Sequence, residues 1–190
     1  AQAVPPATTV PESARCIPVA DAVDVVVAGG GVAAVAAATE AAAQGQSVFL
    51  VAPRLYLGED LVDTMRLWLE EGERPTGALT ERIFSKPGPA APLRVKKTLE
   101  EALTKAGVRF VFGSMPSEVL VDEAGQPAGI VIANRAGRQA VVAKVIIDAT
   151  TEASVAAQAG AAFYPWDGGT VEFCRVVLGG EPAAEERIQR

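Results

Sequence analysis

The chain has 190 residues, of which 49% are hydrophobic and 5% aromatic, and its formal net charge at pH 7 is −6. This length is sufficient for a domain with a real core, and the acidic balance without a basic patch argues against a nucleic-acid binder. There is no histidine, and the two cysteines are far apart in the sequence. We therefore expect no metal site and no disulfide framework, and the longest apolar stretch is too short and too broken by glycines to span a membrane.

Residues 1–21 are rich in Ala, Pro and Thr and lack periodicity, so we expect a flexible leader. One interpretation is a mature end left by signal-peptide removal, which would place the protein in the periplasm or outside the cell. The other is an arbitrary boundary of the chain, and a cytoplasmic location stays open.

Apolar periodicity predicts alternating strands and helices from residue 23 onward. The predicted strands are 23–28, 47–51, 108–112, 118–121, 129–133, 139–142 and 144–149. The predicted helices are 32–44, 61–71 with Asp60 as its cap, 79–84, 93–106 and 152–159. Turn residues separate the three strands between 118 and 142, which is the spacing of an antiparallel meander.

This element order predicts an α/β fold, with a Rossmann-like parallel sheet, a three-stranded antiparallel β-meander insertion and the start of a second, substrate domain. We expect the Rossmann-like domain to occupy residues 22–163. Residues 164–190, β-like between 163 and 180, are then the beginning of a substrate or cap domain, or a tail. Asp24, inside the first strand, is better explained as fixing a neighbouring turn than as a catalytic acid.

The turn between the first strand and the first helix has the spacing of a dinucleotide-binding site. Gly29, Gly31 and Ala34 follow the G-x-G-x-x-G/A pattern. The glycines permit a tight turn and a close approach of backbone to a pyrophosphate, while the alanine keeps the helix near the sheet. The amides of Val32 and Ala33, at the positive end of the helix, then point at the phosphates. The alternative is a tight turn that binds nothing.

Four short motifs extend this likeness over residues 23–163. They are Gly29-Gly30-Gly31, Leu50-Val51-Ala52, Leu57-Gly58-Glu59 and Ile147-Asp148-Ala149-Thr150-Thr151-Glu152. Together they resemble the FAD-dependent oxidoreductases, whose FAD-binding Rossmann fold is of the glutathione-reductase-like kind and is interrupted by a meander.

The resemblance implies FAD as the cofactor and assigns roles by position. The glycine turn and the amides after it would hold the pyrophosphate, position 52 would face the adenosine ribose, and positions 54 and 58 would lie along the cofactor. Backbone near 117–119 would approach the adenine, and positions 148 and 150 would close over the ribityl and phosphate side. The implied cofactor-binding residues are Gly29, Gly31, Val32, Ala33, Ala34, Ala52, Arg54, Gly58, Ser117, Val119, Asp148 and Thr150.

The chain departs from the family pattern at three positions. Ala52 stands where the family has a ribose-binding acid, and Glu59 and Thr151 each replace a glycine. Two hypotheses therefore stay open. The first is the FAD-binding portion of an oxidoreductase that transfers a hydride from an unidentified small-molecule substrate. The remaining substrate domain then belongs either to a longer chain, of which this sequence is a fragment, or to a second polypeptide. The second is a cofactor-free, flavoprotein-like subunit with a structural or assembly role.

A nicotinamide or S-adenosylmethionine Rossmann enzyme is a third possibility, disfavoured by the meander and by the segment Asp148-Ala149-Thr150. Under any of these hypotheses the sequence offers no residue that qualifies as a catalytic acid or base, so none is assigned.

Overall fold

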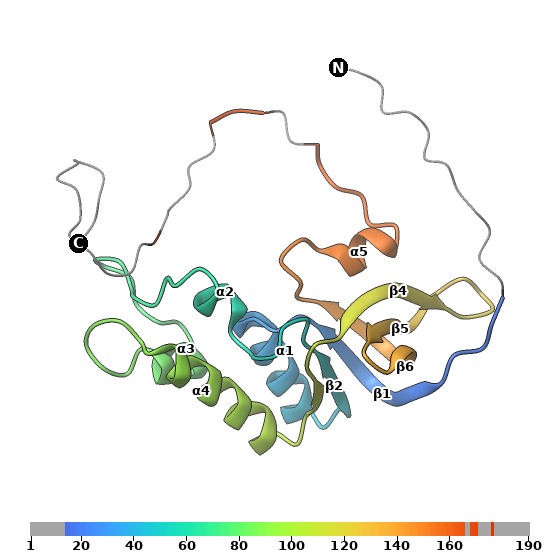
Figure 1. Cartoon of the computed structure of the whole chain (residues 1–190), viewed down its shortest axis with the longest axis horizontal. Coiled ribbons are helices and arrows are strands. Elements are labelled where there is room, and N and C mark those ends of the chain that lie inside the picture. The colour runs from blue at the N-terminus through green and yellow to red at the C-terminus, as the bar shows by residue number, and fades with distance from the viewer. Residues whose placement is uncertain (1–13, 166–167, 171–175, 177–190) are drawn as a thin grey trace.

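The computed structural model describes residues 14–165, 168–170 and 176 (Figure 1). The strands are β1 (Val19–Ala28), β2 (Val48–Val51), β3 (Arg109–Val111), β4 (Met115–Val121), β5 (Pro127–Asn134) and β6 (Gly137–Asp148). The helices are α1 (Val32–Ala43), α2 (Glu59–Val62), α3 (Ala78–Ile83), α4 (Pro92–Lys105) and α5 (Ser154–Gln158). Across this described part of the chain, no helix has the length and apolar character needed to cross a bilayer.

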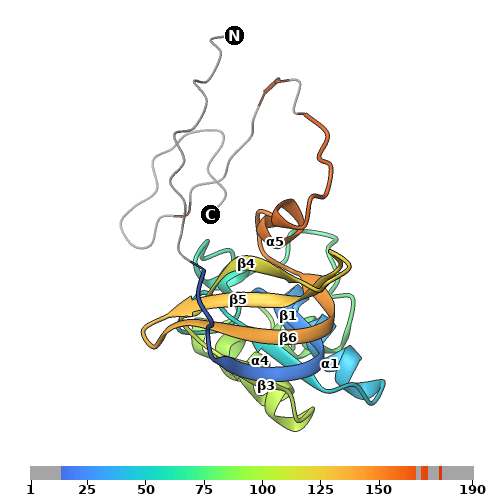
Figure 2. The same ribbon diagram turned by 90° about the vertical axis from the view of Figure 1, so that its right-hand side faces the viewer.

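The strands form one mixed sheet in the order β3-β2-β1-β6-β5-β4. Figure 2 shows the side of the sheet on which β4, β5, β6 and the blue β1 lie next to one another. β3, β2, β1 and β6 are parallel to their neighbours, whereas β6, β5 and β4 pair antiparallel. β6 joins the two halves, because its first residues pair with β5 and its later residues continue along β1 as far as the pair Ala28↔Asp148. The predicted α/β fold with a parallel portion and an antiparallel meander is confirmed.

The sheet has a hydrophobic core on each face. On one face, Val25, Val27 and Leu50 pack against buried residues of α1, α3 and α4, the three helices that lie together in Figure 1. On the other face, Val26 packs with strands of the meander and with Val155 of α5. Alternate residues of β1 therefore face opposite cores, as the period of a strand requires.

Local sequence explains the main helices. α4 begins with proline at its first position, where no backbone N–H is needed, and Gly107 follows its end with a φ of +70°. Its buried face consists of Val95, Thr98, Leu99 and Leu103. α1 is rich in alanine, and its small buried side chains let the helix lie close to the sheet.

Several predicted boundaries were wrong. The helix predicted at 61–71 is only the four-residue α2. After it, Met65 has a φ of +55°, Leu67 is buried in the core, and the Leu67 carbonyl accepts a hydrogen bond from the Ala90 amide at 2.6 Å. The Leu67 carbonyl thus bonds a distant backbone amide instead of the amide four residues later, as it would in a helix.

Another wrong boundary divides 139–142 from 144–149, which are one continuous strand, β6. β1 begins at Val19, four residues earlier than predicted, so residues 19–21 of the predicted flexible leader belong to the sheet. Residues 1–13 of that leader lie outside the described residues. The helix predicted at 152–159 is α5. Of the β-like segment predicted at 163–180, residues 166–167, 171–175 and 177–180 lie outside the described residues, and the described residues 163–165, 168–170 and 176 belong to no strand.

The two leucines of α4 provide a matched test of this packing. Leu99 is fully buried, whereas Leu93 is 74% exposed on the same helix. Leu99→Ala should lower the free energy of unfolding by about 2–5 kcal/mol, because it leaves a cavity in the core. Leu93→Ala should change it by less than about 0.5 kcal/mol. Urea denaturation followed by circular dichroism measures both, and equal losses would contradict the assigned packing.

Candidate cofactor-binding site

The glycine turn after β1 is held by close backbone contacts on two sides. The Gly29 amide donates to the Val51 carbonyl of β2 at 2.9 Å, and the Ala149 amide donates to the Ala28 carbonyl at 2.8 Å. Gly29 has a φ of +136°, and a Cβ there would lie 2.4 Å from the Ala149 oxygen. Only glycine allows the segment after β6 to approach this turn so closely.

The first turn of α1 presents donors to an anion. Gly31 precedes the helix without any side-chain cap, and the Val32 amide donates to the carboxylate of Asp60, at 3.0 Å to Oδ2 and 3.3 Å to Oδ1. The positive end of a helix favours negative charge, and here a carboxylate already occupies that position. The donor set therefore fits a phosphate group of a dinucleotide.

A second carboxylate lies beside the same turn. The Gly30 backbone hydrogen-bonds the carboxylate of Glu59, and a Cβ on Gly30 would lie 3.6 Å from that carboxyl group. Burial raises the pKa of Glu59 above its ordinary value, although the bond from Gly30 and the charge of Arg54 oppose this shift. Glu59 thus brings negative charge to the donors of the glycine turn.

The side chain of Arg54 lies against the carboxylates of Glu59 and Asp63. The guanidinium of Arg54 lies 3.0 Å from Asp63 and 4.0 Å from Glu59, with its side chain 59% exposed. Asp63 also accepts a short hydrogen bond from the Tyr56 hydroxyl, and the Lys96 ammonium of α4 lies 3.7 Å from the centre of the Tyr56 ring. These contacts tie the segment after β2 to α4.

Gly58 connects this segment to the glycine turn. Its amide donates to the Gly30 carbonyl at 2.7 Å, and its φ is +83°. A Cβ at Gly58 would lie 2.6 Å from Cγ1 of Val95 and 3.1 Å from Cδ1 of Leu99. Glycine is required there because the chain passes directly over α4.

The residues predicted near the adenosine lie in two places. Ala52 is fully buried, with its methyl 3.4 Å from the Cβ that Gly30 would carry, and its carbonyl accepts from the Ser114 amide at 3.1 Å. Ser117 and Val119 lie farther along β4. The Ser117 hydroxyl donates to the Val131 carbonyl of β5, and Val119 packs on the second core. Their role toward an adenine stays a prediction.

Asp148 and Thr150 organise the turn between β6 and α5. Oδ1 of Asp148 accepts from the amide and the hydroxyl of Thr150, at 2.9 and 2.6 Å, and Oδ2 accepts from the Ala156 amide at 2.8 Å. Burial opposes ionisation of Asp148, but these hydrogen bonds outweigh it and hold the pKa below its ordinary value. The intervening Ala149 is the residue that contacts Gly29, so this turn lies beside the glycine turn.

The structure therefore brings most of the predicted site residues to one edge of the sheet, around the start of α1. Ala33 is exposed there and Ala34 is buried against the sheet. The residues joined by the contacts described above are Gly29, Gly31, Val32, Ala52, Arg54, Gly58, Asp148 and Thr150.

Sequence reasoning missed the role of Asp60, which was predicted to cap a helix at 61–71. It lies inside α2 instead, and its carboxylate binds the Val32 amide of α1. The prediction failed because it paired the residue with the nearest apolar periodicity. The sequence did contain one indication of this role: Asp60 lies two residues after Gly58, in a segment already predicted to lie along the cofactor.

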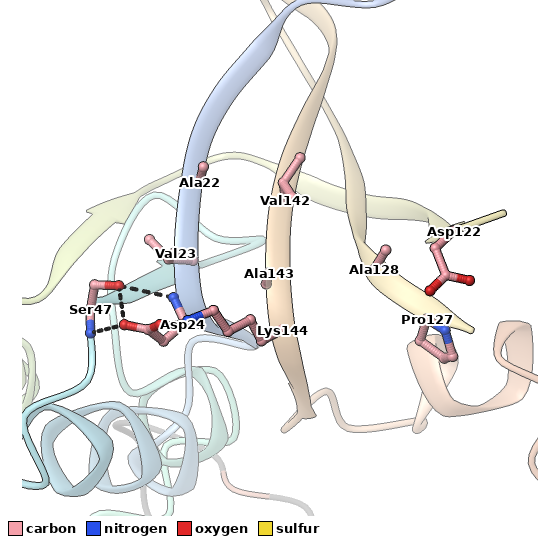
Figure 3. A pocket seen from close by; sticks show the side chains of 10 residues that line it. All are labelled: Ala22, Val23, Asp24, Ser47, Asp122, Pro127, Ala128, Val142, Ala143 and Lys144. Atoms are coloured by element: carbon pink, nitrogen blue, oxygen red, sulfur yellow. Dashed lines mark hydrogen bonds and ion pairs between the residues drawn. The ribbon is translucent and has the colours of Figure 1, made fainter. Parts of the chain in front are cut away.

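A hollow of about 590 Å³ lies elsewhere, along β1, β5 and β6 (Figure 3). Two of its charged groups are paired with each other, since Asp24 accepts from the Lys144 ammonium at 2.6 Å and also from the amide and hydroxyl of Ser47, at 2.9 and 2.6 Å. The third, Asp122, accepts from the amides of Ala124 and Gln126 in its own turn. The bond from Lys144 is the main reason that the pKa of Asp24 lies well below its ordinary value. The predicted role of Asp24, fixing the turn before β2, is confirmed.

A sequence model of the family described as FAD dependent oxidoreductase matches residues 24–174, which is most of the chain. The chain belongs to the FAD-dependent oxidoreductase family. Family membership assigns FAD as the cofactor and a flavin-dependent redox role. No match was found among curated proteins.

Two solved structures with the same fold come from Thermovibrio ammonificans and Thermoplasma acidophilum. The crystal structure of THI4 from Thermovibrio ammonificans has a TM-score of 0.50 and 21% identity, over 72% of this chain and 61% of that one. A geranylgeranyl bacteriochlorophyll reductase-like protein from Thermoplasma acidophilum has a TM-score of 0.51 and 24% identity, over 74% and 42%. The matches thus span about three fifths and two fifths of those structures' own lengths.

The close approach at Gly29 can be tested against a second glycine. Gly29 and Gly45 both have positive φ, but a Cβ at Gly45 would meet nothing within 4 Å. Gly45→Ala should cost about 1–3 kcal/mol of stability from backbone strain alone. Gly29→Ala should cost clearly more, because the methyl overlaps the Ala149 carbonyl. Thermal and urea unfolding compare the two variants, and equal costs would contradict the contact.

The raised pKa of Glu59 predicts a pH dependence. Its pKa in the folded state lies above the ordinary value of 4.5, so the folded protein binds the proton more tightly than the unfolded chain does. Protonation of Glu59 therefore stabilises the fold, and this stabilisation is lost as pH rises through the raised pKa. Glu59→Gln should therefore melt at a higher temperature than the wild type at pH 7. The difference should shrink as pH falls from 7 toward 4.5, because the wild-type carboxyl group becomes protonated over that range. Melting curves across this range test it, and a constant difference would contradict the assignment.

Proposed function

We propose that this chain is the cofactor-binding portion of a flavin-dependent oxidoreductase that acts on a small-molecule substrate by hydride transfer. The observation that carries the proposal is the glycine turn at the start of α1, where the Val32 amide already binds a carboxylate. When bound, the flavin accepts the hydride, so the protein's task is binding, orientation and electrostatics.

The chain's own residues would hold the cofactor at two neighbouring turns. The first turn of α1 would supply amide donors to the diphosphate, and Gly29 allows the segment after β6 to lie directly against this turn. The turn of Asp148 and Thr150 is fixed by its own hydrogen bonds and by the contact of Ala149 with Gly29. Two rigid backbone segments on one edge of the sheet would thus define where the cofactor lies.

A further part of the protein would be needed to cover the flavin. The two solved structures above are longer than the region they share with this chain, which covers 61% and 42% of them. We propose that additional polypeptide, on the same gene product or on a second chain, supplies the surface that binds the substrate. A location outside the cytoplasm stays a prediction, testable by fractionating the cells that make the protein.

Membership of the family favours this role over a cofactor-free structural one. The substitutions that motivate the latter lie at Ala52, Glu59 and Thr151. Glu59 accepts a hydrogen bond from the Gly30 backbone, but the Val32 amide bonds Asp60 and none of these three residues. The Val32 amide in particular depends on the start of α1 and not on any side chain at these positions.

Flavin binding should depend on the diphosphate. The purified chain is expected to bind FAD at one per chain and to bind riboflavin, which lacks the phosphates, at least tenfold more weakly, because the donors of α1 contact only the diphosphate. Titration followed by quenching of flavin fluorescence measures both, with FMN as an intermediate control. Riboflavin binding as tight as FAD binding, or no binding of FAD, would contradict the proposal.

A further inference from the structure

We propose that Asp60 sets this chain's affinity for FAD, by placing its own carboxylate where the cofactor's diphosphate would bind. The inference rests on the proposed function, since it concerns the same glycine turn. It assigns to Asp60 the role of an internal competitor, which must leave the start of α1 before a dinucleotide can occupy it.

The geometry of Asp60 is that of an anion bound at a helix terminus. Both of its carboxylate oxygens lie within hydrogen-bond reach of the Val32 amide, at 3.0 and 3.3 Å. A Cβ on Gly31 would lie 3.1–3.2 Å from the carboxyl carbon and both carboxyl oxygens of Asp60, so the carboxylate lies directly against the glycine backbone. A phosphate group cannot use this surface while Asp60 covers it.

Asp60 is also placed so that it can leave. The residue is exposed, and its helix, α2, has only four residues and no side-chain cap. Rotation of an exposed side chain on so short a helix leaves the core unchanged. Binding of FAD would therefore exchange one anion for another at the Val32 amide, with Gly58 keeping the backbone of α2 in place through its bond to Gly30.

The surrounding charges strengthen the competition. Glu59 and Asp63 lie beside Asp60, and Arg54 is the cation within 4.0 Å of both of them. Because Arg54 offsets part of their charge, the repulsion of a diphosphate by these two carboxylates is a smaller effect than the competition of Asp60 for the amide. In such an equilibrium the apparent dissociation constant rises in inverse proportion to the open fraction, so an open fraction of about one in ten weakens binding about tenfold.

The test compares the affinity of the wild type and of Asp60→Asn for FAD, by fluorescence titration of the purified chain. The amide keeps the size of the carboxylate but removes its charge, so Asp60→Asn should bind FAD at least tenfold more tightly. Asp60→Ala, which removes the acceptor altogether, should bind at least as tightly. Equal affinity of the wild type and both variants would overturn the inference while leaving the proposed function intact.

Two charge-matched variants control for simple electrostatics. Asp63→Asn removes a charge near the turn from a residue bound to Tyr56 and Arg54, and Glu40→Gln removes one from the exposed face of α1. Each should change the affinity less than threefold. A tenfold gain in Asp63→Asn as well would show that overall charge, and not occupation of the amide by Asp60, sets the affinity.

A readout without FAD separates the two proposals further. Hydrogen exchange of the Val32 amide, measured by NMR, should be slow in the wild type and at least tenfold faster in Asp60→Ala, because the carboxylate no longer protects it. Unchanged exchange would overturn the role of Asp60. Failure of every variant to bind FAD, together with the expected change in exchange, would contradict the proposed function and confine Asp60 to capping α1.

Discussion

The fold depends on the close approach of two backbone turns, at Gly29 and at Ala149. The parallel register of β1 and β6 ends both strands at the same level, with Ala28 opposite Asp148. The chain must then leave β1 within a few residues without a side chain pointing at the turn after β6. Glycine meets this requirement, and α1 can begin at once because nothing obstructs its first turn. The position of the anion-binding amides is thus a consequence of strand register.

The start of α1 leaves backbone donors that must be satisfied. Most helices use a side chain at the N-cap for this purpose, but Gly31 has none. The chain satisfies the Val32 amide from a distance instead, through Asp60, which lies twenty-eight residues later. Because this acceptor is a carboxylate, the arrangement that satisfies the Val32 amide also resembles the binding of a phosphate at a helix terminus. On the proposal made above, Asp60 and the cofactor compete for this donor.

The sequence predicted the frame of the molecule because the frame follows from periodicity and from glycine. The strand-turn-helix at residues 23–44, the amphipathic α4 and the meander all have strong local signals. The errors fall where non-local contacts decide. The segment after Val62 shows helical periodicity, yet the Leu67 carbonyl bonds Ala90 and the helix ends after four residues. The single long strand β6 was divided because its first part pairs with β5 and its later part only with β1.

The candidate site shows the same division. Gly29, Gly31 and Val32 were predicted from spacing, and Gly58 from the resemblance. The backbone geometry at Gly29 and Gly58 requires glycine, and a required glycine can be recognised in the sequence. The partner of Val32 was not predicted, since nothing in the local pattern says which distant carboxylate satisfies an amide. The contact of Ala149 with Gly29 could not be predicted either, because it depends on the register of β6 against β1.

The central claim is that the amides at the start of α1 bind the diphosphate of FAD. The most direct measurement is a titration of the isotopically labelled chain with FAD, followed by the shifts of its backbone amide resonances. The account predicts that the largest changes occur at residues 30–33, together with smaller ones at residues 148–150. Changes concentrated around the hollow formed by Asp24, Ser47 and Lys144, with residues 30–33 unaffected, would contradict it.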